Sequence, residues 1–382
     1  MSRLWDPVFG ATAVADATGD RAWIRALCHT EAALARACAS AGLVDDATAD
    51  TIGLACVELA RSDPADLGRR AAGDGNPVIP LVHDLRARVQ DAAGPTAAAG
   101  VHFGATSQDI LDTAAMLVAR SALDVILYAM GDAADACAAL ARRHRTTAMI
   151  GRTLMQQALP TTFGAVAAGW GEGLDRSVAR LGAARAELAV QLGGATGTLA
   201  GWHPDGPAVR AAFAAELALT DPGGVWHTER SRIAALAAGL GITCGSLAKV
   251  AGDVVLLAQT EVGEVLESRG GGSSSMPHKH NPVAAITARA GAAQAPGLVA
   301  TLLAAMPTEL QRGAGPWHAE WQPLTALLNI TGGAAARVAE SLSGLQVDAA
   351  AMARNLALGR SVADAATGAP EIVDAYLARW AR

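Results

Sequence analysis

The amino-acid sequence predicts an all-α protein whose centre is a bundle of long antiparallel helices packed at small crossing angles. Hydrophobic residues make up 51% of the chain and aromatic residues only 4%, so alanine, leucine and valine build the core. Alanine favours helix because it loses no side-chain entropy there. Apolar residues recur at helical spacing along most of the chain, whereas the alternation typical of strands is scarce.

Residues 1–100 are expected to form a small N-terminal helical domain. Its helices are expected where apolar residues recur on one face, as Ile24, Leu27 and Leu34 do. The expected helices span residues 20–42, 47–61 and 77–89. Polar or small residues fill the segments 62–76 and 92–100, where we expect a loop and the end of the domain.

Residues 101–345 are expected to form the central bundle. The expected long helices span residues 109–144, 160–192, 231–267, 282–306 and 317–345. Pro160 is placed to occupy the first turn of the second of them, and a glycine-rich loop is expected over 193–206. These helices are apolar over more of their surface than one chain can cover, which predicts packing against other subunits. Residues 346–382 form a short helical tail.

The charge of the chain argues against two classes of partner. The net charge is −6 and no long run of lysine or arginine occurs, so binding to nucleic acid or to a membrane surface has no electrostatic support. The apolar stretch 114–130 is interrupted by Arg120 and Asp124, which indicates a helix buried in protein rather than a membrane span. A small anionic ligand would need a local basic pocket.

Cysteine usage predicts a cytoplasmic protein, and histidine spacing gives no sign of a metal site. The five cysteines are scattered without a C-x-x-C pair, and the N-terminus lacks the apolar stretch of a signal peptide, so we expect reduced thiols. No H-x-x-x-H motif and no Asp/Glu/His cluster at metal-ligand spacing occurs. His102 and His227 are each candidates for a pocket, although a single histidine is more often packed or exposed.

The segment 271–282, Gly-Gly-Ser-Ser-Ser-Met-Pro-His-Lys-His-Asn-Pro, is the most informative in the chain. Its glycines let backbone N–H groups approach a ligand closely and move. Ser273 is a potential nucleophile or proton carrier. Lys279 and the helix start after Pro282 supply positive potential, which favours an anion. A Gly/Ser run alone is usually a linker, but Met276 and Lys279 at fixed offsets argue against that interpretation.

Two further segments place polar side chains beside expected helix starts. Thr106 and Ser107 could cap the helix that follows them, or could bind a substrate carboxylate together with its free N–H groups. Thr153 and Gln156 are three residues apart, so they can face one side of a turn. Taken alone, their segment is also compatible with a polar connector.

A fourth segment carries Arg312, which could hold a carboxylate through two parallel hydrogen bonds. Glu320 could pair with a cation instead. Trp317 and Trp321, four residues apart, are expected in the interior, and His318 beside them is expected to be structural rather than catalytic.

In this order, these four segments resemble the separate motifs of the fumarase/aspartase superfamily, over roughly residues 1–345. Members of this superfamily make or break a C–O or C–N bond next to a carboxylate. Within it, the chain is most similar to the branch of 3-carboxy-cis,cis-muconate cycloisomerases, which act in aromatic catabolism. The segments that point to this branch are 75–82, 105–109, 226–230, 259–265 and 315–321.

The resemblance implies a fumarase/aspartase-like fold and a homotetramer with shared active sites, each assembled from segments of three subunits. It implies a small tricarboxylate substrate and neither a cofactor nor a metal. It implies catalytic roles for Ser273, as the proton carrier, and for Lys279. Substrate-binding roles are implied for Thr106, Ser107, Gln156, His278, Asn281 and Arg312.

Two features depart from the family pattern. Many amine-eliminating members carry a proton-transferring histidine where this chain has Leu154, which argues against a C–N or C–O lyase of adenylosuccinate or argininosuccinate type acting on a succinyl compound. The cycloisomerase branch also lacks that histidine. The tail, residues 346–382, is shorter than the usual third domain, which leaves a non-catalytic protein on this scaffold as an alternative. The unbroken motif from Ser273 to Asn281 argues against that alternative.

Overall fold

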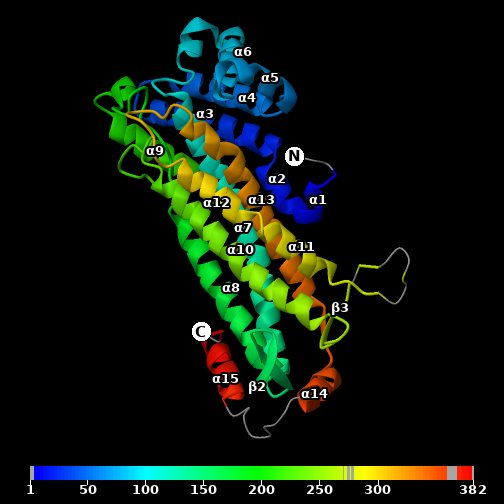
Figure 1. The fold of residues 1–382 in the computed structure, drawn as a ribbon. Coiled ribbons are helices and arrows are strands. Elements are labelled where there is room, and N and C mark those ends of the chain that lie inside the picture. Colours follow the sequence, from blue (N-terminus) through cyan, green and yellow to red (C-terminus); the bar gives the residue numbers. More distant parts are fainter. Residues whose placement is uncertain (1–3, 270, 273–275, 277–278, 359–367, 381–382) are drawn as a thin grey trace.

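The computed structural model describes residues 4–269, 271–272, 276, 279–358 and 368–380. Long helices lie side by side along the molecule (Figure 1). They are α7 (Ser107–Arg143), α8 (Phe163–Ala186), α10 (Ser231–Leu257) and α13 (Pro316–Ser343). α7 packs against α8 and α13, and α10 packs against the same two helices. The predicted all-α class and central bundle are confirmed.

The N-terminal helices gather at one end of the bundle (Figure 1). They are α3 (Asp20–Ser40), α4 (Asp46–Leu59), α5 (Pro64–Asp74) and α6 (Val78–Ala99), preceded by the short α1 (Asp6–Phe9) and α2 (Thr12–Thr18) along the bundle. The loop predicted over 62–76 is wrong, because α5 occupies most of it. Asp63 caps α5 by accepting from Ala65 N, and Pro64 occupies its first turn. The break predicted over 92–100 is a kink at Gly94, whose φ is +83°.

The helix start predicted at Pro160 is also wrong. Pro160 lies in β2 (Gln156–Thr162), which pairs antiparallel with β1 (Ala148–Thr153) as a hairpin. The helix begins at Phe163, where Thr162 accepts from Ala165 N as the cap. A two-stranded ribbon consists of edge strands, so it tolerates a proline that cannot donate a hydrogen bond to the ladder.

Two other predicted helices are shorter than expected, one because it ends early and one because it is divided. The helix predicted over 231–267 ends at Leu257, and β3 (Val265–Glu267) pairs with β4 (Leu345–Val347). The helix predicted over 282–306 is divided into α11 (Val283–Ala292) and α12 (Ala295–Ala304). Pro296 lies in the first turn of α12, where its missing N–H costs nothing, whereas the interior of a continuous helix would need that N–H.

The tail lies at the end of the bundle opposite α3 to α6 (Figure 1). Its helix α14 (Ala349–Leu358) packs on β1, and α15 (Ala369–Trp380) packs on α8. The short η1 (Ala200–Trp202) and α9 (Gly206–Leu217) lie at the same end of the bundle as α3, and α9 packs on α3.

Two apolar cores hold the structure together. One fills the bundle, and the other joins α3 to α6 with α9 and the first turns of α7. Since α7 contributes to both cores, the cores do not mark a domain boundary at residue 100. The boundaries predicted at 100 and 345 stay predictions. Among the described residues, α10 is long and apolar enough to cross a membrane, but it packs against α8, α11 and α13 as a core helix of the bundle does.

Candidate active site

The structure brings two of the predicted substrate-binding residues together. Arg312 Nη1 donates to Thr106 Oγ1 at 2.8 Å, and Arg312 Nη2 donates to the Ala195 carbonyl at 3.0 Å. Thr106 is the N-cap of α7 and forms a capping box with Asp109, while Ser107 begins the helix. The capping role of Thr106 is therefore real, and its hydroxyl also orients a guanidinium. This arrangement places a cation beside a helix N-terminus, which suits an anion.

A buried carboxylate, that of Asp109, lies next to the Arg312–Thr106 pair. Asp109 is fully buried, and its two oxygens accept hydrogen bonds from Thr106 N, Gly193 N, Gly194 N and His227 Nε2 at 2.7 to 3.0 Å. His227, a predicted pocket residue, is thus held by a carboxylate in the interior. Sequence reasoning did not identify this role of Asp109, because three of its partners are more than eighty residues away.

The described ends of the segment 271–282 join β3 to α11. Ser273 and His278 lie outside the described residues. Asn281 and Gly271 exchange backbone hydrogen bonds of 2.9 and 3.0 Å, so the two ends of the segment are held together. The Lys279 side chain is exposed.

The helix start after Pro282 is not a free anion site, contrary to expectation. The buried carboxylate of Glu267, in β3, accepts from Ala284 N at 3.1 Å and from Ala285 N at 2.9 Å. A protein carboxylate therefore already satisfies the N–H groups at the start of α11. Lys279 remains the source of positive charge in this segment.

Gln156 lies far from Thr106 within one chain. It is exposed on the hairpin that follows the C-terminal end of α7, whereas Thr106 caps the N-terminal end. A helix of 37 residues is about 55 Å long, so the two side chains lie at opposite ends of the bundle. The described chain therefore places the predicted residues in separate neighbourhoods: Thr106, Ser107 and Arg312 in one, and Gln156, Lys279 and Asn281 elsewhere.

The hairpin that carries Gln156 has an unusual turn. Leu154 and Met155 have φ angles of +50° and +64°, a region that favours glycine. The Leu154 side chain is 96% exposed. Close to this turn, Arg152 forms a two-point ion pair with the buried Glu264 at 2.7 and 2.9 Å. A strained turn held in place by an ion pair is typical of a segment that contacts a ligand or another subunit.

A second buried ionic cluster joins α7, α10 and α13. Arg230 donates to both oxygens of Asp112 and to both oxygens of Glu320 at 2.5 to 3.1 Å, and all three side chains are at most 3% exposed. Burial disfavours the charge of Arg230, but Asp112 and Glu320 outweigh it and hold the pKa of Arg230 above its usual range. The predicted pairing of Glu320 with a cation is confirmed.

The aromatic residues of α13 pack beside this cluster. Trp317 is buried and donates to Asp112 Oδ1 at 2.9 Å, and its ring meets that of Trp321 edge to face at a centroid distance of 5.0 Å. The predicted interior position is confirmed for Trp317, whereas Trp321 is only half-buried. His318 is exposed and stacks against Trp321 at 4.8 Å.

His102 and Glu31 form a further buried pair near the start of α7. His102 Nδ1 lies 2.6 Å from Glu31 Oε1, and the two side chains are 13% and 0% exposed. Burial alone would lower the pKa of His102, but the attraction and hydrogen bond of Glu31 outweigh it, so the pKa of His102 lies above its ordinary value. The folded protein therefore favours the protonated imidazole.

This pair predicts a dependence of stability on pH. Because the pKa of His102 is raised on folding, its stabilisation is complete below about pH 6.5 and is lost as the pH rises through the raised pKa. The free energy of unfolding, measured with urea from about pH 5.5 to 9, is expected to fall more steeply with pH in the wild type than in Glu31→Gln. Equal slopes in the two proteins would contradict the assignment.

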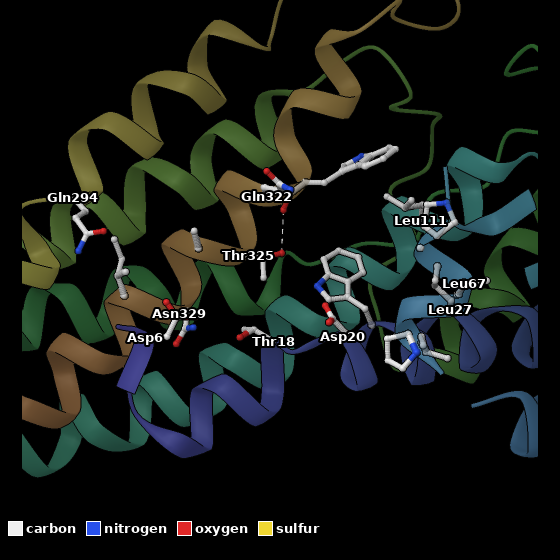
Figure 2. Close-up of a pocket in the computed structure, with 18 residues that line it drawn as sticks. Asp6, Thr18, Asp20, Leu27, Leu67, Leu111, Gln294, Gln322, Thr325 and Asn329 are labelled. Carbon is white, nitrogen blue, oxygen red and sulfur yellow. Dashed lines mark hydrogen bonds between the residues drawn. The ribbon is translucent and has the colours of Figure 1, made fainter. Parts of the chain in front are cut away.

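A cavity of about 540 Å³ lies where α1, α2 and α3 meet α13 (Figure 2). Polar side chains line one part of it and leucines another, and none of the lining residues is a predicted site residue. The residues labelled in Figure 2 are Asp6, Thr18, Asp20, Leu27, Leu67, Leu111, Gln294, Gln322, Thr325 and Asn329. This cavity is therefore separate from the Arg312–Thr106 pair.

The five cysteines are free, as predicted, and all of them are buried. Burial raises the pKa of Cys38 and of Cys244 to about 11, so both thiols stay protonated at neutral pH. In the described parts of the chain, no group of three or more histidine, cysteine, aspartate or glutamate side chains is placed to hold a metal ion.

Comparison with known proteins identifies the class of this site. A family profile described as Lyase matches residues 7–297. A 3-carboxy-cis,cis-muconate cycloisomerase from Bradyrhizobium diazoefficiens is 46% identical over 360 residues, 93% of this chain and 79% of that protein. A nitrosuccinate lyase from Streptomyces davaonensis is 45% identical over 371 residues, 94% of this chain and 77% of that protein.

A solved structure agrees with the sequence matches. The crystal structure of 3-carboxy-cis,cis-muconate lactonizing enzyme from Pseudomonas putida has a TM-score of 0.88 and 42% identity, and the match covers 94% of this chain and 80% of that chain. The sequence matches and the fold thus define an enzyme of the lyase class. The chain belongs to the Lyase family, within the fumarase/aspartase superfamily that its motifs resemble.

Proposed function

We propose that the protein is a cycloisomerase that interconverts 3-carboxy-cis,cis-muconate and a carboxymuconolactone in the breakdown of an aromatic acid. The observation that carries this proposal is the set of curated relatives of that name, which are 40 to 46% identical over most of the chain. The Arg312–Thr106 pair supports it, because a substrate with three carboxylates needs fixed cations and donors.

The proposed reaction is an intramolecular addition. One carboxylate oxygen of the substrate bonds to a carbon of the conjugated C=C, and a proton is delivered to the neighbouring carbon. In reverse, the proton next to a carboxylate leaves and negative charge builds on that carboxylate, so fixed donors and cations lower the barrier. Lys279 and Asn281 would meet this charge, and Ser273 would carry the proton.

The remaining groups would hold the substrate. Arg312, Thr106 and Ser107 would bind the carboxylates that do not react, with Gln156 and His278 contributing further polar contacts. Holding the attacking carboxylate close to the C=C makes the ring closure effectively unimolecular and removes much of its entropic cost. No cofactor or metal is required by this chemistry.

The assembly we propose is a cytoplasmic homotetramer with shared active sites. Within one chain, Gln156 and Arg312 lie at opposite ends of the bundle, so a site that uses both must draw them from different subunits. Neighbouring chains packed antiparallel would bring the hairpin of one subunit to the Arg312 end of another. Light scattering of the purified protein measures the assembly, and a stable monomer with full activity would contradict it.

A second candidate function is elimination from nitrosuccinate, because the nitrosuccinate lyase match is almost as strong as the cycloisomerase match. Elimination would break the C–N bond and remove the neighbouring proton, leaving fumarate and nitrite. Incubation with each substrate separates the candidates. Loss of the conjugated diene with formation of a lactone supports the cycloisomerase, whereas release of nitrite and fumarate with no lactone supports the lyase.

Replacing Lys279 by methionine is expected to lower kcat/KM by roughly 10- to 100-fold, since a hydrogen bond to a charged group is worth about 1.5–3 kcal/mol. The chain has one other lysine, Lys249, whose exposed side chain pairs with Asp253 on α10. Lys249→Met is therefore a matched control and should leave the kinetics unchanged. If KM alone changes in Lys279→Met, this lysine binds the substrate and does not stabilise the transition state.

A further inference from the structure

We infer that the buried Asp109 carboxylate positions the anion clamp of Arg312 and Thr106, and that Thr228 transmits this positioning to the loop that carries Arg312. Asp109 touches neither the Arg312 side chain nor, in this inference, the substrate. The inference rests on the proposed function for the identity of the bound anion. It assigns roles to two residues outside the sequence-predicted site.

The first connection runs through the start of α7. Asp109 Oδ2 accepts from Thr106 N at 3.0 Å, which fixes the backbone of the N-cap residue. The hydroxyl of the same threonine accepts from Arg312 Nη1 at 2.8 Å. Asp109 thus sets the position of the first group that orients the guanidinium.

The second connection runs through the glycine loop. Asp109 accepts from Gly193 N and Gly194 N, each at 2.9 Å. The next residue, Ala195, supplies the carbonyl that accepts from Arg312 Nη2 at 3.0 Å. Gly194 has a φ of +72°, and a Cβ there would lie 3.0 Å from a backbone oxygen, so the loop needs glycine at this point.

The third connection runs through His227 to the loop before α13. His227 Nε2 bonds Asp109 Oδ1 at 2.7 Å, and the next residue is Thr228. Thr228 Oγ1 donates to the Leu310 carbonyl at 3.1 Å, and the Thr308 hydroxyl donates to the Thr228 carbonyl at 2.7 Å. These two bonds hold the loop residues that immediately precede Arg312.

This loop needs such support because its backbone is strained. Leu310 has a φ of +48°, and its side chain is 87% exposed, so packing contributes little to holding it. Both Arg312 acceptors are neutral groups, and in the described parts of the chain no carboxylate lies within ion-pair distance of its guanidinium. The charge of Arg312 is held in place and left available to an anion.

Only a carboxylate satisfies all of these contacts. An ionised aspartate accepts hydrogen bonds at both oxygens, whereas an asparagine amide would direct two N–H donors at other donors. Asp109 is 0% exposed, so water cannot replace a lost partner. Asp109→Asn should therefore disturb all three connections, and it puts folding at risk as well.

Thr228 provides a variant that tests the inference without altering the buried carboxylate. Thr228→Val keeps the shape and removes the hydroxyl, while Thr228→Ser keeps the hydroxyl. We expect Thr228→Val to raise KM for 3-carboxy-cis,cis-muconate about five- to tenfold, the value of one hydrogen bond, with kcat changed less than about twofold. Thr228→Ser should restore KM to within about twofold of the wild type.

Hydrogen–deuterium exchange over residues 306–315 supplies a readout that does not depend on the reaction. Exchange there should become faster in Thr228→Val and Asp109→Asn, and should match the wild type in Thr228→Ser and in Thr301→Val, a control on the exposed face of α12. Unchanged exchange in Thr228→Val, or an equal rise of KM in the valine and serine variants, would overturn the inference. If the wild type forms no lactone, the proposed function fails, and the exchange comparison still decides the positioning role.

Discussion

Replacing Ser273 by alanine is expected to lower the turnover of 3-carboxy-cis,cis-muconate by about 10²- to 10⁴-fold, the usual worth of a positioned general acid or base. The substitution removes one hydroxyl oxygen, so the fold and the assembly should survive. A free serine is a weak base, and it can carry a proton here only if positive groups such as Lys279 stabilise its alkoxide. Steady-state kcat and the thermal midpoint measure the two expectations.

The neighbouring serine is the control for this prediction. Ser274→Ala changes the same kind of residue in the same segment, and we expect its kcat to stay within about threefold of the wild type, since it carries no proton. If Ser274→Ala is inactive and Ser273→Ala is not, the proton carrier is misassigned by one position. If both variants keep full turnover, neither hydroxyl takes part in the chemistry.

The long helices could be predicted because their apolar residues recur at helical spacing over many turns. The predictions over 109–144 and 317–345 correspond closely to α7 and α13. Shorter elements carry only a local signal and are harder to predict. Asp63-Pro64 is a cap followed by a first-turn proline, and it begins a helix where a loop was expected. β1 and β2 depend on pairing with each other, and their alternation is too short to stand out.

The candidate site was predictable only where its chemistry lies in local motifs. Motif order identified Thr106 and Arg312, and the structure places Arg312 Nη1 2.8 Å from Thr106 Oγ1. Partners that come from distant segments were not predictable. Glu267 satisfies the N–H groups of α11, and no spacing in the sequence joins it to them. Residues that we propose to act across subunits are the extreme case, because Thr106 and Gln156 lie near opposite ends of the 37-residue helix α7, which is about 55 Å long.

The buried cluster of Arg230, Asp112 and Glu320 shows why such partners matter for stability. Each charge in it has been removed from water, which costs several kcal/mol, and only the close pairing of one guanidinium with two carboxylates offsets that cost. The Trp317 indole N–H adds a hydrogen bond to Asp112, so the cluster links α7, α10 and α13. Removing one carboxylate leaves the guanidinium short of the partners that stabilise its charge.

Glu320→Ala is therefore expected to lower the free energy of unfolding by about 3–5 kcal/mol, the usual loss when one partner of a buried ion pair is removed. Glu340→Ala on the same helix is the control, because Glu340 pairs with Arg337 where both side chains are 33% exposed, and such pairs contribute at most about 1 kcal/mol. Urea unfolding at one fixed protein concentration measures both variants, since subunit association also contributes to apparent stability. Equal losses in the two variants would mean that water or a rearranged neighbour compensates Arg230.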